Sequence, residues 1–303
     1  MHRALALTLM LLWAPVTFAP TSRPAITGLA FVQFQVSKVD AAGKFYGDYL
    51  GLPASRECWG PSATTCFFIT PYQDVEILRS GEQRADVPQT NSLLTTVGVW
   101  TENAGSLRGF LLSRGLHPGD LSSPRRGRDQ FEISDPEGHR LVFLSLVGSS
   151  PNHLDARTQA SHHMIHTGFV VRDRDSEDRL YKDVLGFHVY WHGGMKDGED
   201  NWVDMQVPEG TDWIEYMLRV PPDASHKTLG VMNHIALGVP DIQIAKEQLT
   251  KNGWKATEEP KIGRDGKAQL NLYDPDETRV ELMEFAPTKE PCCSPYTGPH
   301  PHQ

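Results

Sequence analysis

The sequence predicts an α+β fold of four βαβββ units, arranged as two duplicated halves. Two recurring patterns support the duplication. Residues 45–52 read Phe-Tyr-Gly-Asp-Tyr-Leu-Gly-Leu and recur at 180–187 as Leu-Tyr-Lys-Asp-Val-Leu-Gly-Phe, an offset of 135 (180 − 45). The turn Asp-Pro-Glu-Gly at 135–138 recurs as Asp-Pro-Asp-Glu at 274–277, an offset of 139 (274 − 135). Two unrelated patterns at nearly one offset indicate a duplicated chain.

Each half divides again into two units. A unit opens with a short apolar, β-branched run typical of a strand, and a segment of helical character follows. The opening runs are residues 29–36, 95–100, 166–171 and 234–239, and the helical segments are 41–50, 104–114, 178–185 and 242–252. Further short strands complete the units, for example 66–70, 75–78, 270–273 and 279–285.

The ends of the chain differ from these two halves. A basic start, an apolar run and a small residue at Ala19 predict a signal peptide over residues 1–19, so we expect a secreted or periplasmic protein. The predicted domains are residues 26–148 and 163–287, joined by a polar segment. Residues 288–303 are rich in Pro, Cys and His, and we expect a disordered tail there.

Composition excludes several classes of protein. The chain has 303 residues, of which 39% are hydrophobic and 22% charged, as in ordinary globular proteins. Its net charge of −9 argues against nucleic acid as a partner, and the N-terminal apolar run is too short to span a membrane. We therefore expect a monomer or homodimer that takes a small-molecule substrate. Cys58 and Cys66 bracket a Gly-Pro turn, where a hairpin disulfide is geometrically possible.

Four such units, with the repeated Tyr-x-Asp-x-Leu-Gly pattern and the Asp-Pro turn before the last strand, resemble the vicinal oxygen chelate superfamily. This superfamily contains glyoxalase I, extradiol dioxygenases, and fosfomycin- and bleomycin-resistance proteins. The resemblance covers nearly the whole mature chain. It implies that each half is a curled mixed sheet around a cleft, with one divalent metal held by residues from the first and last strands of the units.

In the second half, all four of those positions carry metal-binding side chains. His166 and His234 open the first strands, and Glu215 and Glu281 lie in the last strands among apolar residues. A carboxylate among apolar residues is costly unless it is paired or bound to metal. The resemblance thus implies a site of these four residues for Fe²⁺, Zn²⁺, Ni²⁺ or Mn²⁺. In the first half, the aligned residues are Phe31, Glu76, Thr95 and Val142, so we expect no complete metal site there.

Two enzyme classes and one binding class are compatible with this site. A four-ligand site predicts glyoxalase-like isomerase or lyase chemistry, with Glu215 or Glu281 as the catalytic base. A triad of His166, His234 and Glu281 would instead resemble an Fe²⁺ extradiol dioxygenase. That family's pattern departs here, since Asn271 stands where it has a tyrosine. The third alternative is a secreted small-ligand-binding protein without catalysis. Four other histidines lie near the predicted site, and each either supports the ligands or the catalysis or is an exposed loop residue: His162, His163, His188 and His192.

Overall fold

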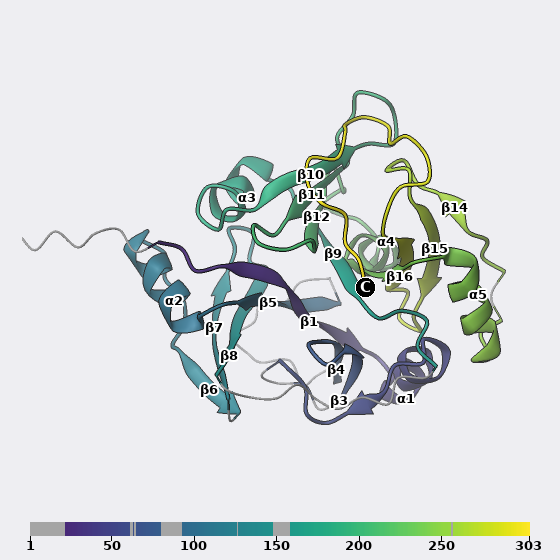
Figure 1. Ribbon diagram of the computed structural model, residues 1–303, viewed down its shortest axis with the longest axis horizontal. Helices are drawn as coiled ribbons and strands as arrows, with labels where there is room; N and C mark the ends of the chain where they lie inside the picture. The colour runs from purple at the N-terminus through teal and green to yellow at the C-terminus, as the bar shows by residue number, and fades with distance from the viewer. Residues whose placement is uncertain are drawn as a thin grey trace, which may run out of the picture.

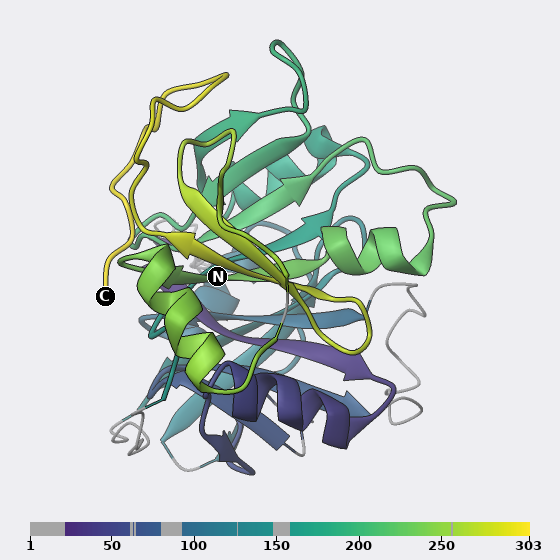
Figure 2. The same cartoon turned by 90° about the vertical axis from the view of Figure 1, so that its right-hand side faces the viewer.

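The computed structural model of the chain describes residues 22–60, 63, 65–79, 93–125, 127–147, 158–255 and 257–303. The predicted signal peptide, residues 1–19, and most of the predicted linker lie outside these residues. The described part contains two mixed sheets of eight strands, one from each half of the sequence (Figures 1 and 2). The predicted α+β fold of paired βαβββ units is confirmed.

The two sheets have the same strand order. The first runs β2-β3-β4-β1-β5-β8-β7-β6, and the second runs β10-β11-β12-β9-β13-β16-β15-β14. The first strands of the two units pair antiparallel at the centre of each sheet, and each is flanked by the parallel last strand of its own unit.

The strands of the first sheet are β1 Ile26–Val36, β2 Ala54–Ser55, β3 Thr65–Thr70, β4 Gln73–Arg79, β5 Leu94–Thr101, β6 Ser122–Arg125, β7 Arg128–Ser134 and β8 Arg140–Leu146. Those of the second are β9 Met164–Val170, β10 His188–Gly193, β11 Trp202–Gln206, β12 Trp213–Met217, β13 His234–Val239, β14 Lys261–Ile262, β15 Ala268–Tyr273 and β16 Arg279–Glu284. The helical segments are α1 Val39–Gly43, the π-helical turn η1 Lys44–Tyr49, α2 Ala104–Ser113, α3 Arg174–Tyr181, α4 His226–Met232 and α5 Ile242–Lys251.

Helices follow the first strand of each unit, as predicted, and in the second half each is capped by an aspartate. The side chain of Asp173 accepts the Ser176 N–H at 3.1 Å, and that of Asp241 accepts the Ile244 N–H at 3.0 Å. These caps satisfy amides that have no partner inside the helix, so they fix where α3 and α5 begin. The cap starts α3 at Arg174, four residues before the predicted start at 178. The sequence analysis did not predict α4.

The two patterns that revealed the duplication also bind the halves together. The Tyr46 hydroxyl donates to Asp274 at 3.1 Å, and the Tyr181 hydroxyl donates to Asp135 at the same distance. Each tyrosine therefore belongs to one half and its aspartate to the other. All four side chains are buried, and one apolar cluster runs through both halves beneath them. The repeated residues are thus kept at the surfaces where the halves meet.

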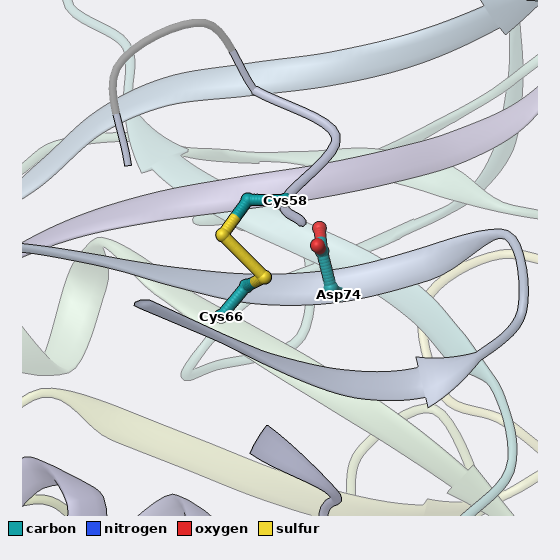
Figure 3. Close-up of side chains that lie close together, drawn as sticks. All are labelled: Cys58, Cys66 and Asp74. Carbon is teal, nitrogen blue, oxygen red and sulfur yellow. A yellow bond between two sulfur atoms is a disulfide. The ribbon is translucent and has the colours of Figure 1, made fainter. Parts of the chain in front are cut away.

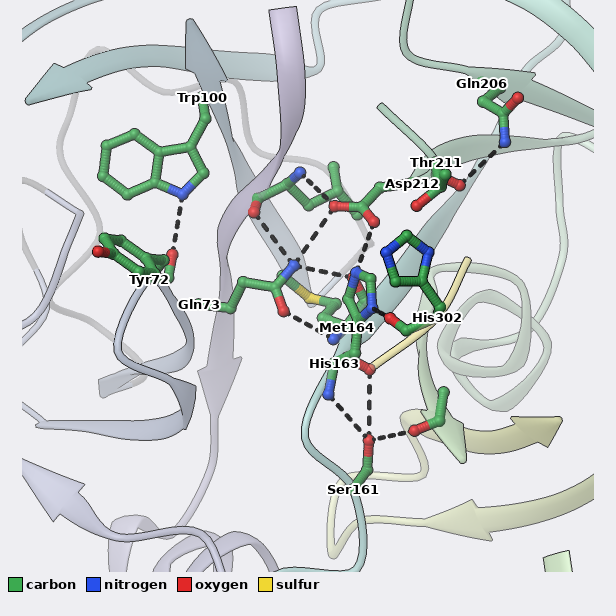
Figure 4. Close-up of polar contacts among 12 residues, drawn as sticks. Tyr72, Gln73, Trp100, Ser161, His163, Met164, Gln206, Thr211, Asp212 and His302 are labelled. Carbon is green, nitrogen blue, oxygen red and sulfur yellow. Dashed lines mark hydrogen bonds and ion pairs between the residues drawn. The ribbon is translucent and has the colours of Figure 1, made fainter. Parts of the chain in front are cut away.

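A polar network centred on Asp212 makes a further connection between the halves (Figure 4). Its carboxylate accepts the Leu29 N–H of β1 at 2.8 Å and pairs with the ring of His163 at 2.7 Å. The Gln73 side chain both donates to and accepts from the backbone of Met164, at 3.0 and 2.9 Å. The other ring nitrogen of His163 faces the His302 carbonyl at 2.6 Å, and a carbonyl can only accept. His163 is therefore placed to be doubly protonated.

Stability should depend on pH through His163. Burial lowers the pKa of this imidazole, but the hydrogen bond and charge of Asp212 outweigh burial, so the net pKa is raised. A raised folded-state pKa stabilises the fold fully below the unfolded value and no longer does so once the pH passes the folded value. His163→Gln should cost about 2 kcal/mol of unfolding free energy at pH 6 and much less at pH 9. Denaturant unfolding of both proteins at the two pH values measures this, and an equal loss at both would contradict it.

The C-terminal tail is a correction to the sequence analysis. Residues 288–303 were expected to be disordered, but they pack along β10 at the edge of the second sheet (Figures 1 and 2). The Thr297 amide donates to the Tyr190 carbonyl at 3.0 Å, and the Tyr296 hydroxyl donates to the Asp265 carbonyl at 2.8 Å. Cys292 and Cys293 form a disulfide. These long-range contacts hold a segment that has no regular secondary structure.

No helix in the described residues is long and apolar enough to cross a membrane.

Candidate metal centre

The four predicted ligands lie on four neighbouring strands of the second sheet. Strands β12, β9, β13 and β16 are adjacent in this order and carry Glu215, His166, His234 and Glu281. In the strand register, Gly168 lies opposite both Glu215 and His234, and Ala236 lies opposite both His166 and Glu281. Successive side chains of a strand alternate between faces, so these registers point all four side chains to one face.

Donor atoms of His166, His234 and Glu281 lie within 4.8 Å of one another, and Glu215 lies beside both histidines. His166 Nε2 lies 3.1 Å from His234 Nε2, 3.7 Å from Glu215 Oε2 and 3.9 Å from Glu281 Oε2. His234 Nε2 lies 3.1 Å from Glu215 Oε2. Two donors that each lie about 2.1 Å from one ion at a right angle are about 3.0 Å apart. The spacing therefore suits a single ion, and two imidazoles with two carboxylates suit a divalent transition metal.

His234 is in the tautomer that binds metal through Nε2, whereas His166 Nδ1 is buried with no hydrogen-bond partner among the described residues. His234 Nδ1 lies 3.0 Å from the Met232 carbonyl, which can only accept, so Nδ1 carries the proton and Nε2 is left as an acceptor. Arg279 donates to this Nε2 at 2.6 Å. Burial lowers the pKa of His234 and His166 well below the usual value, and the charge of Arg279 adds to the effect at both rings. Neutral imidazoles fixed by a carbonyl are the ligand form seen in metal sites.

The two carboxylates need a cation. Glu281 is buried, and the side chain of Glu215 is only 12% exposed. Burial raises the pKa of both to about 7, against the opposing effect of Arg279. A divalent ion between them would favour the charged forms and offset the cost of burying two acids. The residues present therefore fit a divalent metal.

The absence of a side chain at position 168 makes room for His234. A Cβ on Gly168 would lie 2.3 Å from His234 Cε1, far inside van der Waals contact. Gly168→Ala should therefore displace this imidazole and weaken metal binding about 100-fold without removing any donor. Gly109→Ala is the matched control, because a Cβ there meets nothing within 4 Å. Isothermal titration of both variants measures the effect, and equal affinities would show that His234 is misplaced.

Three of the four donor residues line a cavity of about 320 Å³: His166, Glu215 and Glu281. Sequence reasoning gave no role to four of the charged residues near the donors: Asp204, Asp265, Lys267 and Arg279. Asp204, Asp265 and Arg279 line the cavity. Lys267 is buried, and its ammonium lies 4.6 Å from the centroid of the Trp213 ring. Burial lowers the pKa of Lys267 to about 8, while Asp265 and Asp204 oppose this. The Nε of Arg279 and the Nζ of Lys267 are buried with no hydrogen-bond partner among the described residues.

The first half supplies a comparison that could have revealed Arg279. At the offset of 139, its counterpart is Arg140 (279 − 139), whose guanidinium is held by Glu132 at 3.0 Å. The counterpart of Glu132 is Asn271 (132 + 139), which has no carboxylate to hold an arginine. Arg279 turns to His234 instead. Asn271, at the position where the first half has the acid Glu132, was the sequence feature that could have pointed to Arg279.

The corresponding place in the first half is filled. In the register, Phe31 matches His166, Glu76 matches Glu215 and Val142 matches Glu281. The residue matching His234 is Thr96 and not Thr95, because Gln33 pairs with Thr96 as Gly168 pairs with His234. This corrects the sequence alignment by one residue. Thr96 and Val142 are 46 residues apart (142 − 96), whereas His234 and Glu281 are 47 apart (281 − 234), so a single offset along the chain misplaces the match by one residue.

Side chains and a loop occupy the space that a metal would need in that half. The Glu76 carboxylate accepts from Gln33 Nε2 at 2.8 Å and from the Gly60 amide. The Cys58–Cys66 disulfide ties the loop down beside Asp74 (Figure 3). Sulfurs bonded to each other offer no thiolate to a metal. That the first half lacks a complete metal site stays a prediction.

The four other histidines do not reach the cavity. Among the described residues that line it, His166 is the one histidine. His163 pairs with Asp212, His192 pairs with Asp200 at 2.7 Å, and His188 contacts Gln206 at 3.2 Å. His162 borders a different surface hollow. His163, His192 and His188 thus have structural partners elsewhere.

Comparison with known families places this site in a class of proteins. Residues 163–282 match the family model of the Glyoxalase/Bleomycin resistance protein/Dioxygenase superfamily, and the matched segment contains all four donors. This match in the second half of the chain confirms the resemblance found in the sequence. A probable chloroplastic lactoylglutathione lyase of Arabidopsis thaliana is 23% identical over 134 residues, which are 43% of this chain. This chain covers 38% of that protein's length.

Solved structures share the two-domain fold. Homoprotocatechuate 2,3-dioxygenase from Arthrobacter globiformis gives a TM-score of 0.60 at 18% identity, covering 89% of this chain and 84% of that one. A variant of homoprotocatechuate 2,3-dioxygenase from Brevibacterium fuscum gives 0.61 at 17% identity, covering 92% and 75%. At such identities the likeness establishes the fold and leaves the reaction open.

Proposed function

We propose that this protein is an exported, divalent-metal-dependent enzyme that isomerises or cleaves a small substrate chelating the metal through oxygen. The convergence of His166, Glu215, His234 and Glu281 from four strands carries the proposal. When bound, the ion would act as a Lewis acid on the oxygens of the substrate. The lyase among the relatives agrees with this class of reaction.

The protein's own residues would bind the substrate and move a proton. Glu215, whose pKa burial raises to about 7, is suited to take a proton from a carbon beside a carbonyl group and return it to the neighbouring carbon. Glu281 is the alternative base, with a similar pKa. Arg279 borders the cavity with an unpartnered Nε and would orient an anionic oxygen of the substrate.

The second candidate is an extradiol dioxygenase. One donor atom from each of His166, His234 and Glu281 can be chosen so that all three lie within 4.8 Å of one another. This is the composition of the two-histidine, one-carboxylate triad of iron oxygenases. The neighbours of similar fold carry that activity in their names. Glu215 favours the first candidate, because it lies 3.1 Å from His234 and adds a fourth donor.

Export is supported by the cysteines. All four form disulfides, which persist in oxidising compartments and are rare in the cytosol. An exported enzyme has no reliable supply of glutathione, so we propose a substrate other than a glutathione adduct. Detection of the mature protein outside the cytoplasm with a start after residue 19 would support export, and an intact Met1 on cytosolic protein would refute it.

A paired substrate screen tests the reaction. Protein purified without oxygen is incubated with catechols while oxygen uptake is followed, and separately with 2-oxoaldehydes and a small thiol while product is followed. The proposal expects turnover in the second assay and no oxygen uptake in the first. Ring cleavage with oxygen uptake would establish the dioxygenase. Tight ligand binding with neither reaction would establish the binding protein.

A further inference from the structure

A second cluster of potential metal donors lies where the two halves meet. Asp135 follows β7 and His139 precedes β8 in the first half, and Glu177 belongs to α3 of the second. One donor atom from each can be chosen so that all lie within 4.8 Å of one another. Asp135 and Glu177 are buried, and the His139 side chain is 23% exposed. None of the three lines the cavity of the candidate metal centre.

The hydrogen bonds of this cluster leave one carboxylate oxygen unused. Asp135 accepts from the Tyr181 hydroxyl at 3.1 Å, from the His139 amide at 2.7 Å and from the His139 ring at 2.7 Å. Glu177 Oε1 accepts the Glu137 amide at 3.0 Å, but its Oε2 is buried with no hydrogen-bond partner. An oxygen of Glu177 lies within 4.8 Å of an oxygen of Asp135. Two buried carboxylates in contact require a proton or a metal cation.

A buried hydroxyl at the same junction is also unpartnered. Tyr216 is fully buried, and its hydroxyl has no hydrogen-bond partner among the described residues. The carboxylates of Asp178, Glu177 and Asp135 lie near this hydroxyl. An oxygen that neither donates nor accepts beside several carboxylates marks a place where a ligand is missing from the hydrogen-bond network.

The duplication provides an internal control. The other junction has the same tyrosine–aspartate hydrogen bond, here called the clasp. In it, Asp274 accepts from the Tyr46 hydroxyl at 3.1 Å and from the Thr278 amide at 2.9 Å. At the offsets of the two repeated patterns, Ala42 stands for Glu177 (177 − 135) and Thr278 for His139 (139 + 139). The clasp thus forms without a second acid or an imidazole. Glu177 and His139 are additions to it, and both are metal-binding residue types.

We propose that Asp135, His139 and Glu177 form a second divalent-metal site, of the zinc type, that joins α3 of the second half to the Asp-Pro turn of the first. One imidazole and two carboxylates are ligands that Zn²⁺ accepts, with further positions open to water. Because the donors come from both halves, metal binding stabilises the junction between them. This site is separate from the candidate metal centre and does not depend on the proposed reaction.

Zinc titration of the full-length, metal-stripped chain tests the proposal. We expect two equivalents of Zn²⁺ on the wild type and one on Glu177→Gln, on His139→Ala and on His234→Ala. The double variant His139→Ala, His234→Ala should bind none. Thr278→Val is the matched control at the equivalent of position 139 and should bind two. Zinc should raise the melting temperature of Glu177→Gln less than that of the wild type.

The variants separate this inference from the proposed function. If Glu177 carries a proton and no metal, Glu177→Gln imitates the neutral acid and leaves the zinc stoichiometry unchanged, which overturns the second site. If one equivalent is lost in Glu177→Gln and none in His234→Ala, the second site stands and the candidate metal centre fails. Because glutamine is neutral, Glu177→Gln should melt in EDTA no lower than the wild type, so misfolding cannot imitate the expected loss.

Discussion

Replacing His234 with alanine should remove one bound metal per chain and abolish activity. The imidazole is fully buried, its Nδ1 is fixed by the Met232 carbonyl, and its Nε2 lies 3.1 Å from two other donor atoms. Loss of a donor fixed in this way should lower metal affinity at the candidate centre by at least about 100-fold. Glu281→Gln should have the same effect, since it removes the charge of the donor on β16.

Elemental analysis and isothermal titration measure this loss. His192→Ala is the control, because His192 pairs with Asp200 and does not line the cavity. It should retain the full metal content and activity. Unchanged metal occupancy in His234→Ala would show that the four donors are a consequence of duplicated strands and not a metal site.

Replacing Glu215 with glutamine should separate the two enzyme classes. In the four-donor site this residue is a ligand and the favoured base, so Glu215→Gln should bind metal weakly and lose about 10²–10⁴-fold in turnover. In a dioxygenase the triad of His166, His234 and Glu281 suffices, so the variant would keep its metal and its oxygen-dependent ring cleavage. Oxygen uptake and metal content together decide between these outcomes.

The matched control is Glu76→Gln. Register places Glu76 at the equivalent position of the first half, where its carboxylate accepts hydrogen bonds from Gln33 and Gly60. This variant should retain wild-type metal content and turnover. If Glu76→Gln lost as much metal as Glu215→Gln, the assignment of the metal to the second half would be wrong.

The sequence predicted the fold because its repeated residues have a structural task. Tyr46, Asp135, Tyr181 and Asp274 form the two clasps between the halves, so the same pattern is needed in both copies. The candidate ligands could be predicted because the two halves differ at the corresponding positions. Metal-binding residues stand at equivalent positions of two units in one half, whereas in the other half a phenylalanine, a threonine and a valine replace three of the four.

What the sequence could not predict depends on contacts between distant strands. Arg279 reaches His234 because Asn271, on the neighbouring strand, lacks the acid that holds Arg140 in the other copy. The match of His234 to Thr96 is read from strand pairing, because the two copies differ in length by one residue between these strands and the last strands of their units. The tail is ordered by contacts such as that of Tyr296 with Asp265. Each of these requires knowing which strands are neighbours.

The most direct test of the metal centre is a crystal structure of protein purified without oxygen, with anomalous diffraction recorded at the absorption edge of the metal found by elemental analysis. We predict an anomalous peak about 2.0–2.3 Å from Nε2 of His166 and His234 and from oxygens of Glu215 and Glu281. Arg279 should then have withdrawn from His234 Nε2. A metal-replete crystal with no peak between these donors, and with Arg279 still bonded to His234, would contradict the account.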